Sequence, residues 1–294
     1  MSLTNIIKGL LRTMRPKQWL KNGFVFLPLV FDFKMFVTKP LVNTLVGFIV
    51  LCALSSVVYL INDAVDAPQD RLHPKKKNRP IAKGIVSIRL AIGCAIVLGI
   101  LSLTLAFWLN PLFGVVAATY LAMQIAYSFV LKHVVLVDVF VIAIGFVLRV
   151  VAGIPLVDAE RFSPWLFVCT LFMSLLLGFG KRRQEIVELK GSSNTRAILS
   201  EYNLSLLDQI IPIITAGLIV SYSFYTFSAP QLPTNHAMMI TIPVAMYGLF
   251  RYLYLVHVRG EGGAPDELLF RDRPLLLATL LFSLIAILVL YVFR

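Results

Sequence analysis

Long apolar runs dominate this 294-residue chain and restrict the class of fold that it can adopt. A helix needs about 20 predominantly apolar residues to cross the hydrocarbon core of a bilayer. A ninth, shorter run at 22–37 has Asp32 and Lys34 near its end, and we expect it to span as well. The chain is therefore predicted to be an all-α, multi-pass membrane protein with about nine transmembrane helices. The eight full-length runs lie at 41–61, 88–109, 112–131, 134–154, 164–180, 208–228, 236–256 and 275–293.

The composition supports this class, since 59% of the residues are apolar and only 14% are charged. Such values exclude a disordered chain, a nucleic-acid-binding domain and an ordinary soluble enzyme. Residues 1–21 combine Lys and Arg with apolar residues, as expected of an amphipathic segment on the membrane surface. No linker divides the chain, so we expect one membrane domain over 1–294, with polar loops at 62–87, 181–207 and 257–274.

The distribution of positive charge predicts the orientation of the chain. With nine spans, 22 of the 27 Lys and Arg residues fall on the side that holds the amino terminus, and four fall on the other side. The four on the other side are Lys34, Lys39, Arg161 and Arg294. Cytoplasmic loops carry an excess of Lys and Arg. We therefore predict a plasma-membrane (inner-membrane) protein whose amino terminus and long polar loops face the cytoplasm, where its chemistry is expected.

Three aspartates follow the second run in the pattern N-D-x-x-D-x-x-x-D, which begins at Asn62. On a helix this spacing puts Asp63, Asp66 and Asp70 on one face. Carboxylates that close repel one another unless a cation lies between them, and Mg²⁺ takes oxygen ligands from carboxylates and substrate phosphates. We predict a Mg²⁺ site at Asp63, Asp66 and Asp70, with Asn62, Asp63 and Asp66 as catalytic residues. The alternative is a solvated acidic helix end.

Further polar residues cluster near the ends of other runs, and they are candidates for contacts with an anionic substrate. For many of them topology gives a competing explanation, because lysines anchor membrane interfaces and mark cytoplasmic loops. A cation inside a span is costly unless it meets a cavity or a partner, so we expect Arg149, with Asp138, to face a central cavity. The candidates are Lys17, Gln18, Lys21, Asn22, Arg79, Tyr127, Lys132, Arg149, Lys181, Arg182, Arg183 and Glu185.

These features together resemble the UbiA superfamily of intramembrane prenyltransferases. The resemblance rests on the aspartate motif, on the segment Tyr127-Ser-x-x-Leu-Lys132 and on the nine runs, and it covers essentially the whole chain. It implies a UbiA-like helical bundle with an active-site cavity that faces the cytoplasm. Typical members of the superfamily carry a second motif, D-x-x-x-D, in the loop after span six, which helps to hold a second Mg²⁺ on a prenyl diphosphate. Here K-R-R-Q-E at 181–185 replaces it.

One branch of the superfamily shares that departure. The segments R-P-K-Q-W-L-K-N, H-P-K-K-K-N-R-P-I-A and G-K-R-R-Q-E resemble the decaprenyl-phosphate phosphoribosyltransferases, as do 196–208 and 265–273. The resemblance implies Mg²⁺-dependent transfer of a 5-phosphoribosyl group from phosphoribosyl diphosphate (PRPP) to a polyprenyl phosphate such as decaprenyl phosphate. Diphosphate would be released, and the product would serve cell-wall arabinan synthesis. The implied partners are PRPP, a polyprenyl phosphate and membrane lipids, while homo-oligomerisation stays open.

Two other functions agree with parts of the pattern. A prenyltransferase that joins a prenyl diphosphate to an aromatic or other acceptor would share the first motif and the fold, but not the extra cations. A transporter of a phosphorylated lipid or sugar would use the polar clusters as a path. Transporters often contain internal repeats, and we find none in this sequence.

Overall fold

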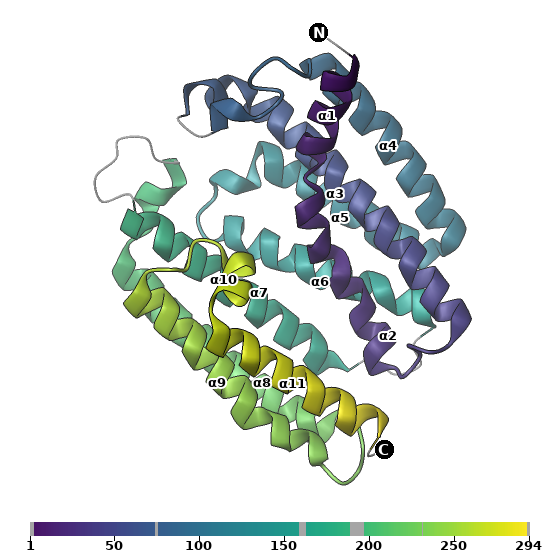
Figure 1. Ribbon diagram of the computed structural model, residues 1–294, viewed down its shortest axis with the longest axis vertical. Helices are drawn as coiled ribbons and strands as arrows, with labels where there is room; N and C mark the ends of the chain where they lie inside the picture. Colours follow the sequence, from purple (N-terminus) through teal and green to yellow (C-terminus); the bar gives the residue numbers. More distant parts are fainter. Residues whose placement is uncertain (1–2, 74–75, 159–162, 189–196, 231, 293–294) are drawn as a thin grey trace. The chain divides into compact units, whose positions relative to one another are not determined.

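The computed structural model describes an all-helical chain over residues 3–73, 76–158, 163–188, 197–230 and 232–292 (Figure 1). The chain divides into two compact units. The first unit comprises Met1–Val134 and Leu148–Glu160, and the second comprises Val135–Val147 and Arg161–Arg294. Five of the Lys and Arg residues counted in the charge distribution lie outside the described residues, namely Lys75, Arg161, Lys190, Arg196 and Arg294.

Eight helical segments among the described residues are long and apolar enough to cross a membrane, and they confirm the eight full-length predicted runs. The seventh segment combines three elements, because its helix α9 is flanked by a 3₁₀ turn and a π-helical turn. The segments are α3 (Thr38–Leu72), α4 (Ile88–Leu109), α5 (Pro111–Phe129), α6 (Val137–Val157), α7 (Pro164–Glu188), α8 (Leu204–Ser228), Ala237–Arg259 (η5 Ala237–Ile240, α9 Thr241–Tyr254 and η6 Leu255–Arg259) and α11 (Arg273–Tyr291).

The ninth predicted span, 22–37, is not a single long α-helix and is not among the eight candidate spanning helices of the described residues. The chain forms the 3₁₀ helix η1 (Pro16–Phe26) and then the short helix α2 (Leu27–Phe31). Pro28 lacks the amide hydrogen that a continuous helix would need there. Figure 1 shows that the segment still runs alongside α3 in the opposite direction. In η1, the Trp19 indole donates to Ser56 Oγ of α3.

Helix ends differ from the boundaries that hydropathy predicts. Helix α1 (Leu3–Met14) ends before the Arg15-Pro16 pair. The predicted surface segment 1–21 is therefore α-helical only over its first part and continues as the 3₁₀ helix η1. Helix α3 continues to Leu72, and α7 continues to Glu188, into regions that the sequence assigned to loops. Hydropathy detects the apolar stretch that a bilayer requires, whereas a helix continues through polar residues as long as its backbone hydrogen bonds are satisfied.

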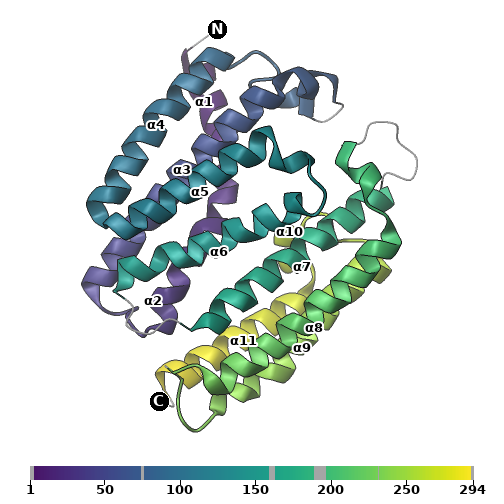
Figure 2. The ribbon, with the colours of Figure 1, turned by 180° about the vertical axis from the view of Figure 1, so that it is seen from behind.

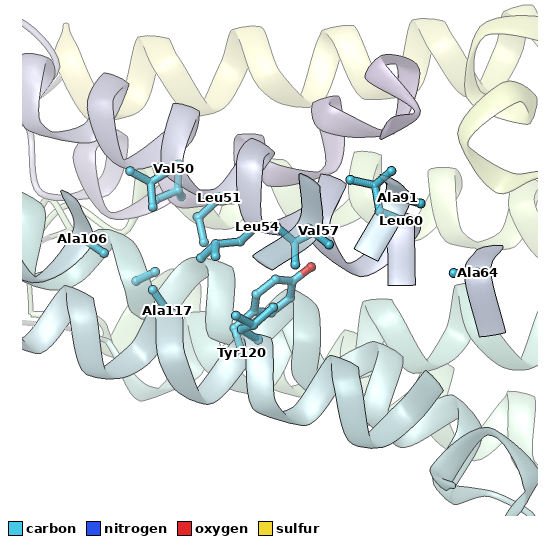
Figure 3. Close-up of a cluster of buried hydrophobic side chains, with 14 of the residues drawn as sticks. Val50, Leu51, Leu54, Val57, Leu60, Ala64, Ala91, Ala106, Ala117 and Tyr120 are labelled. Atoms are coloured by element: carbon cyan, nitrogen blue, oxygen red, sulfur yellow. The ribbon is translucent and has the colours of Figure 1, made fainter. Parts of the chain in front are cut away.

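The first unit is built around α3, α4 and α5. Helices α4 and α5 form a hairpin at Asn110, whose side chain accepts hydrogen bonds from the amides of Leu112 and Phe113 and so caps α5. Small residues on α4 and α5 let these helices pack closely against the large apolar side chains of α3 (Figure 3). The buried side chains shown include Val50, Leu51, Leu54, Val57, Leu60, Ala64, Ala91, Ala106, Ala117 and Tyr120.

The second unit has its own apolar core. Helices α7 and α8 run alongside each other (Figure 2), and α9 packs against α11. Asn203 caps α8 and Asp272 caps α11, each by accepting a hydrogen bond from a backbone amide in the first turn. The short helix α10 (Pro265–Arg271) precedes α11. The core of this unit includes Val139, Leu175, Leu176, Phe179, Leu207, Ile211, Tyr252 and Leu268.

Many large apolar side chains are exposed on the outside of these helices. On α4 alone, Ile96, Val97, Ile100 and Leu101 are each more than half exposed, and Trp108 is 81% exposed. A water-soluble monomer rarely exposes so much contiguous apolar surface. Together with the eight apolar helices, this surface identifies a multi-pass membrane protein.

Candidate functional site

The aspartate motif lies on the last turns of α3, in the first unit. Asp63 and Asp70 are buried, and Asp66 is partly exposed. The helix is continuous through these residues, so their carboxylates share one face as the spacing predicted. Asn62 donates from its side-chain amide to Asp66 Oδ2 at 3.2 Å.

Cations from three distant segments neutralise these carboxylates. Arg15 Nη2 lies 2.6 Å from Asp63 Oδ1, and Lys132 Nζ lies 2.7 Å from Asp66 Oδ1. Arg79 Nη1 bridges two carboxylates, at 3.1 Å from Asp63 Oδ1 and 2.6 Å from Asp70 Oδ2. A buried carboxylate that loses its partner destabilises a protein by about 3–5 kcal/mol. The cations are thus part of the fold around the motif. Asp63 and Asp70 are buried and ion-paired, whereas Asp66 keeps partial exposure to solvent.

A cavity of about 270 Å³ opens beside Asp63. Four cationic side chains and one carboxylate contribute to its wall, so the cavity is strongly positive. Arginine guanidinium groups bind phosphate oxygens in pairs of parallel hydrogen bonds. The cavity therefore has the charge and the donors that a phosphate-bearing ligand requires. It is lined by Arg12, Arg15, Asp63, Lys76, Asn78, Arg79 and Pro80.

The sequence reasoning missed Arg15 as a site residue. Its backbone has φ 54° and ψ 64°, a left-handed conformation that a residue other than glycine seldom adopts. This turn separates α1 from η1 and directs the side chain to Asp63, with the guanidinium carbon 4.8 Å from the centre of the Tyr59 ring. The Arg15-Pro16 pair was a usable signal, because proline disfavours the right-handed helical conformation in the preceding residue.

Two predicted substrate contacts, Asn22 and Arg149, belong to a buried polar network in the first unit. Asn22 is fully buried, and Arg149 is 9% exposed. Arg149 donates from Nε to Asn22 Oδ1 and from Nη2 to the Tyr120 hydroxyl, each at 2.8 Å. Ser55 also donates to Asn22 Oδ1. These bonds join η1, α3, α5 and α6 and satisfy a cation within the apolar bundle.

The remaining candidates of the first unit lie around η1 and the end of α5. Lys17 is exposed on η1, while Gln18, Lys21 and Tyr127 are partly buried. Among the described residues, the wall of the cavity does not include any of these four. Their predicted contacts with a substrate stay predictions.

The basic cluster after span six lies in the second unit. Lys181 is exposed, whereas Arg182 is 4% exposed and donates to Asp138 Oδ2 at 2.8 Å and to Glu185 Oε2 at 2.6 Å. Asp138 is fully buried, so the expectation that it faces a cavity is wrong. Arg183 pairs with Asp208 Oδ1 at 2.6 Å. Two of the three predicted phosphate ligands are thus held by carboxylates of their own unit.

Tyr202 completes that cluster and was also missed by the sequence reasoning. Its hydroxyl donates to Asp138 Oδ1 at 2.6 Å and accepts from the Leu136 amide at 2.7 Å. Burial, and then the hydrogen bond to Asp138, raise the pKa of the Tyr202 phenol well above its usual range. The phenol therefore stays protonated and keeps its role as a donor to Asp138.

The carboxylates of the motif fit a Mg²⁺ ion that arrives with a phosphorylated ligand. In the part of the chain that the structure describes, no three Asp, Glu, His or Cys side chains form a ready-made metal cage. Mg²⁺ is usually held by one or two carboxylates together with substrate phosphates. Asp63 lines the positive cavity, and Asp66 lies one helical turn further along α3. A third ligand at Asp70 stays a prediction.

Comparisons with known proteins place the chain among transferases of one fold. It is 32% identical over 287 residues to decaprenyl-phosphate phosphoribosyltransferase of Mycolicibacterium smegmatis, covering 92% of this chain and 89% of that protein. It is 33% identical to the protein of the same name from Mycobacterium tuberculosis, covering 94% and 92%. The Corynebacterium glutamicum protein of that name is 31% identical, covering 98% and 88%.

Solved structures show the same fold at lower sequence identity. The structure of a UbiA homolog from Archaeoglobus fulgidus bound to GPP and Mg²⁺ matches with a TM-score of 0.73 and 19% identity, covering 97% of this chain and 100% of that one. A UbiA homolog from Aeropyrum pernix matches with a TM-score of 0.63 and 14% identity, covering 90% and 97%. The UbiA prenyltransferase family matches residues 33–271. With this match and the full-length relatives, the chain belongs to the UbiA prenyltransferase family.

Proposed function

We propose that this protein transfers a 5-phosphoribosyl group from PRPP to a polyprenyl phosphate and releases diphosphate. The observation that carries the proposal is the cavity beside Asp63, where four cations meet the aspartate motif. A donor with a diphosphate and a 5-phosphate requires more positive charge than a prenyl diphosphate. The names of the full-length relatives, all decaprenyl-phosphate phosphoribosyltransferases, support the same reaction and a decaprenyl acceptor.

In the proposed reaction, an oxygen of the lipid phosphate attacks C1 of the ribose. The bond between C1 and the diphosphate oxygen breaks, and the diphosphate leaves with the electron pair. The lipid phosphate is already anionic near neutral pH, so the step needs no general base to activate its nucleophile. When bound, Mg²⁺ would neutralise the negative charge that develops on the leaving diphosphate.

The chain's own residues divide the remaining tasks. Asp63 and Asp66 would hold Mg²⁺ by their carboxylate oxygens, and Asn62 orients Asp66 through its hydrogen bond. Arg79 lies at the cavity and can bind phosphate oxygens there. Lys132 contacts Asp66 and so lies beside the metal position. We retain Lys17, Gln18, Lys21, Tyr127 and Lys181 as candidates for further phosphate contacts, and Asn22, Arg149, Arg182, Arg183 and Glu185 as residues that act through the networks described above.

We also propose that the site faces the cytoplasm of a cell whose inner membrane holds the protein. Within the first unit, the ion pair between Arg15 and Asp63 places the basic amino-terminal segment at the same end as the aspartate motif. The cations counted on one side of the membrane include those of this segment and of the loop after α3. The excess of Lys and Arg on cytoplasmic loops supports this sidedness. PRPP, a soluble donor, would then enter from the cytoplasm.

The test uses the full-length protein reconstituted in lipid with Mg²⁺, PRPP and decaprenyl phosphate, and mass spectrometry of the extracted lipid. We expect the lipid to gain the mass of one phosphoribosyl group. A parallel reaction contains a prenyl diphosphate and an aromatic acceptor. Prenylation of that acceptor, with no change in decaprenyl phosphate, would refute the proposal and favour the alternative prenyltransferase. Unchanged lipid together with movement of substrate across the vesicle membrane would indicate a transporter.

A matched pair of carboxylate variants ties the reaction to the site. Asp63→Asn removes the charge beside the cavity and is expected to reduce turnover by at least about a thousandfold, because the leaving diphosphate loses its metal. Asp32→Asn removes a carboxylate that pairs with Lys34, outside the residues that line the cavity. It is expected to keep turnover within about twofold, since this pair does not contact the cavity. Equal activity in both variants would contradict the assignment.

A further inference from the structure

Arg15 forms an ion pair with Asp63, the carboxylate that would hold the proposed metal. Its Nη2 lies 2.6 Å from Asp63 Oδ1, and Arg79 Nη1 approaches the same oxygen at 3.1 Å. The Asp63 side chain is only 2% exposed, whereas that of Arg15 is 31% exposed. The carboxylate is therefore fixed in the fold, and the guanidinium has access to the cavity.

Electrostatic repulsion disfavours simultaneous contact of the Arg15 guanidinium and a divalent ion with the Asp63 carboxylate. A cation of charge two at the carboxylate would repel a guanidinium in direct contact with it. The buried carboxylate cannot remain uncompensated either, because an unpaired buried charge is strongly destabilising. Arg15, the nearer of the two guanidinium groups on Asp63 Oδ1, thus competes with a divalent ion for this carboxylate.

The displaced guanidinium has a destination within reach. Arg15 lines the same cavity as Arg12, Lys76 and Arg79, where the proposed function puts the phosphates of the donor. The Tyr59 ring, 4.8 Å from the Arg15 guanidinium carbon, supports the group without adding a second negative charge. A guanidinium that leaves Asp63 can therefore bind phosphate oxygens while remaining in the site.

We propose that Arg15 is an exchangeable counter-ion of the site. It neutralises Asp63 while the site is empty and moves to the donor's phosphates when a divalent metal takes its place. The inference rests on the proposed function only where it names a diphosphate-bearing donor. It makes Arg15 both a competitor of the metal and a ligand of the donor, so its removal changes the two affinities in opposite directions.

The experiment measures both affinities in the full-length protein reconstituted in lipid. Mn²⁺ serves as the probe for the metal, and its binding without donor is followed by the loss of the free-ion signal in electron paramagnetic resonance. Inorganic diphosphate with Mg²⁺ serves as the probe for the donor's leaving group, and its binding is followed by calorimetry. Arg15→Gln is expected to bind Mn²⁺ about tenfold more tightly and diphosphate about tenfold more weakly. A tenfold change in affinity corresponds to the lower end of the coupling energies of close charge pairs.

Arg12→Gln is the matched control, because Arg12 lines the cavity but is exposed on α1. It is expected to weaken diphosphate binding while leaving Mn²⁺ affinity within about twofold, since it does not hold Asp63. The proposal is overturned if Arg15→Gln leaves Mn²⁺ affinity unchanged, or if it weakens both ligands together as a purely structural residue would.

If Arg15→Gln does not fold, Arg15→Lys gives the second test, since lysine keeps the charge but loses the planar fork. The same two opposite changes are expected at smaller size, and unchanged affinities would overturn the proposal. Failure of the proposed function has a different signature. Opposite changes in the two affinities, without phosphoribosyl transfer by any variant, would refute the function and retain the counter-ion role.

Discussion

The Arg79–Asp70 ion pair offers a quantitative test of the structure around the motif. Arg79 Nη1 lies 2.6 Å from Asp70 Oδ2, with side-chain exposures of 24% and 4%. Hydrogen bonds to charged groups contribute about 1.5–3 kcal/mol, whereas exposed ion pairs contribute about 0.2–1 kcal/mol. This pair has one buried and one partly exposed partner, so we expect a coupling free energy of about 1.5–2 kcal/mol.

The assay is a double-mutant cycle of Arg79→Gln, Asp70→Asn and the double variant. The free energy of unfolding of each protein is measured in detergent by chemical denaturation, followed by circular dichroism. A control cycle combines Arg71→Gln with Asp70→Asn. Arg71 is exposed and donates a hydrogen bond to the Ala82 carbonyl. The control coupling should lie within about 0.5 kcal/mol of zero. An Arg79–Asp70 coupling below about 0.5 kcal/mol, or one equal to the control, would refute the reasoning.

Three further predictions concern other parts of the molecule. Arg149→Met should lower the free energy of unfolding by about 3 kcal/mol, because two charge-assisted hydrogen bonds to Asn22 and Tyr120 are lost; a thermal melt identical to that of the unmodified protein would contradict this. Chelation of divalent ions by EDTA should abolish phosphoribosyl transfer, and added Mg²⁺ should restore it; full activity in EDTA would exclude the metal role. The hydrogen bond from Arg251 holds the pKa of the Asp272 carboxyl below its usual range. Its contribution to stability is therefore present above about pH 4 and is lost as the pH falls through the lowered pKa. The difference in melting temperature between the unmodified protein and Asp272→Asn should shrink at acid pH, and an equal difference at pH 3 and pH 7 would oppose this assignment.

The sequence predicted the spanning helices well because the bilayer imposes one strong requirement on composition. Helix α4 begins and ends where its apolar run does, at Ile88 and Leu109. The 22–37 segment failed as a helix prediction because apolar composition alone does not distinguish an α-helix from a 3₁₀ helix. Pro28 and the packing of η1 along α3 determine that difference.

The candidate site was predictable only in its local part. The aspartate motif is a spacing within one helix, so the sequence contains it completely. Two partners of its carboxylates come from far along the chain, since Arg15 and Asp63 are 48 positions apart and Lys132 and Asp66 are 66 positions apart. Which of many cations meets which carboxylate depends on how the helices pack. For the same reason the sequence treated Arg182 as a phosphate ligand, although Asp138, 44 residues away, binds it in a buried pair.

The most direct test of the central claim follows the two halves of the donor separately. PRPP labelled in the ribose and PRPP labelled in the β-phosphate are each incubated with the reconstituted protein, Mg²⁺ and decaprenyl phosphate. Attack at C1 predicts that the ribose label enters the lipid while the β-phosphate label leaves as soluble diphosphate. Entry of the β-phosphate label into the lipid, or absence of both labels from the lipid, would contradict phosphoribosyl transfer at this site.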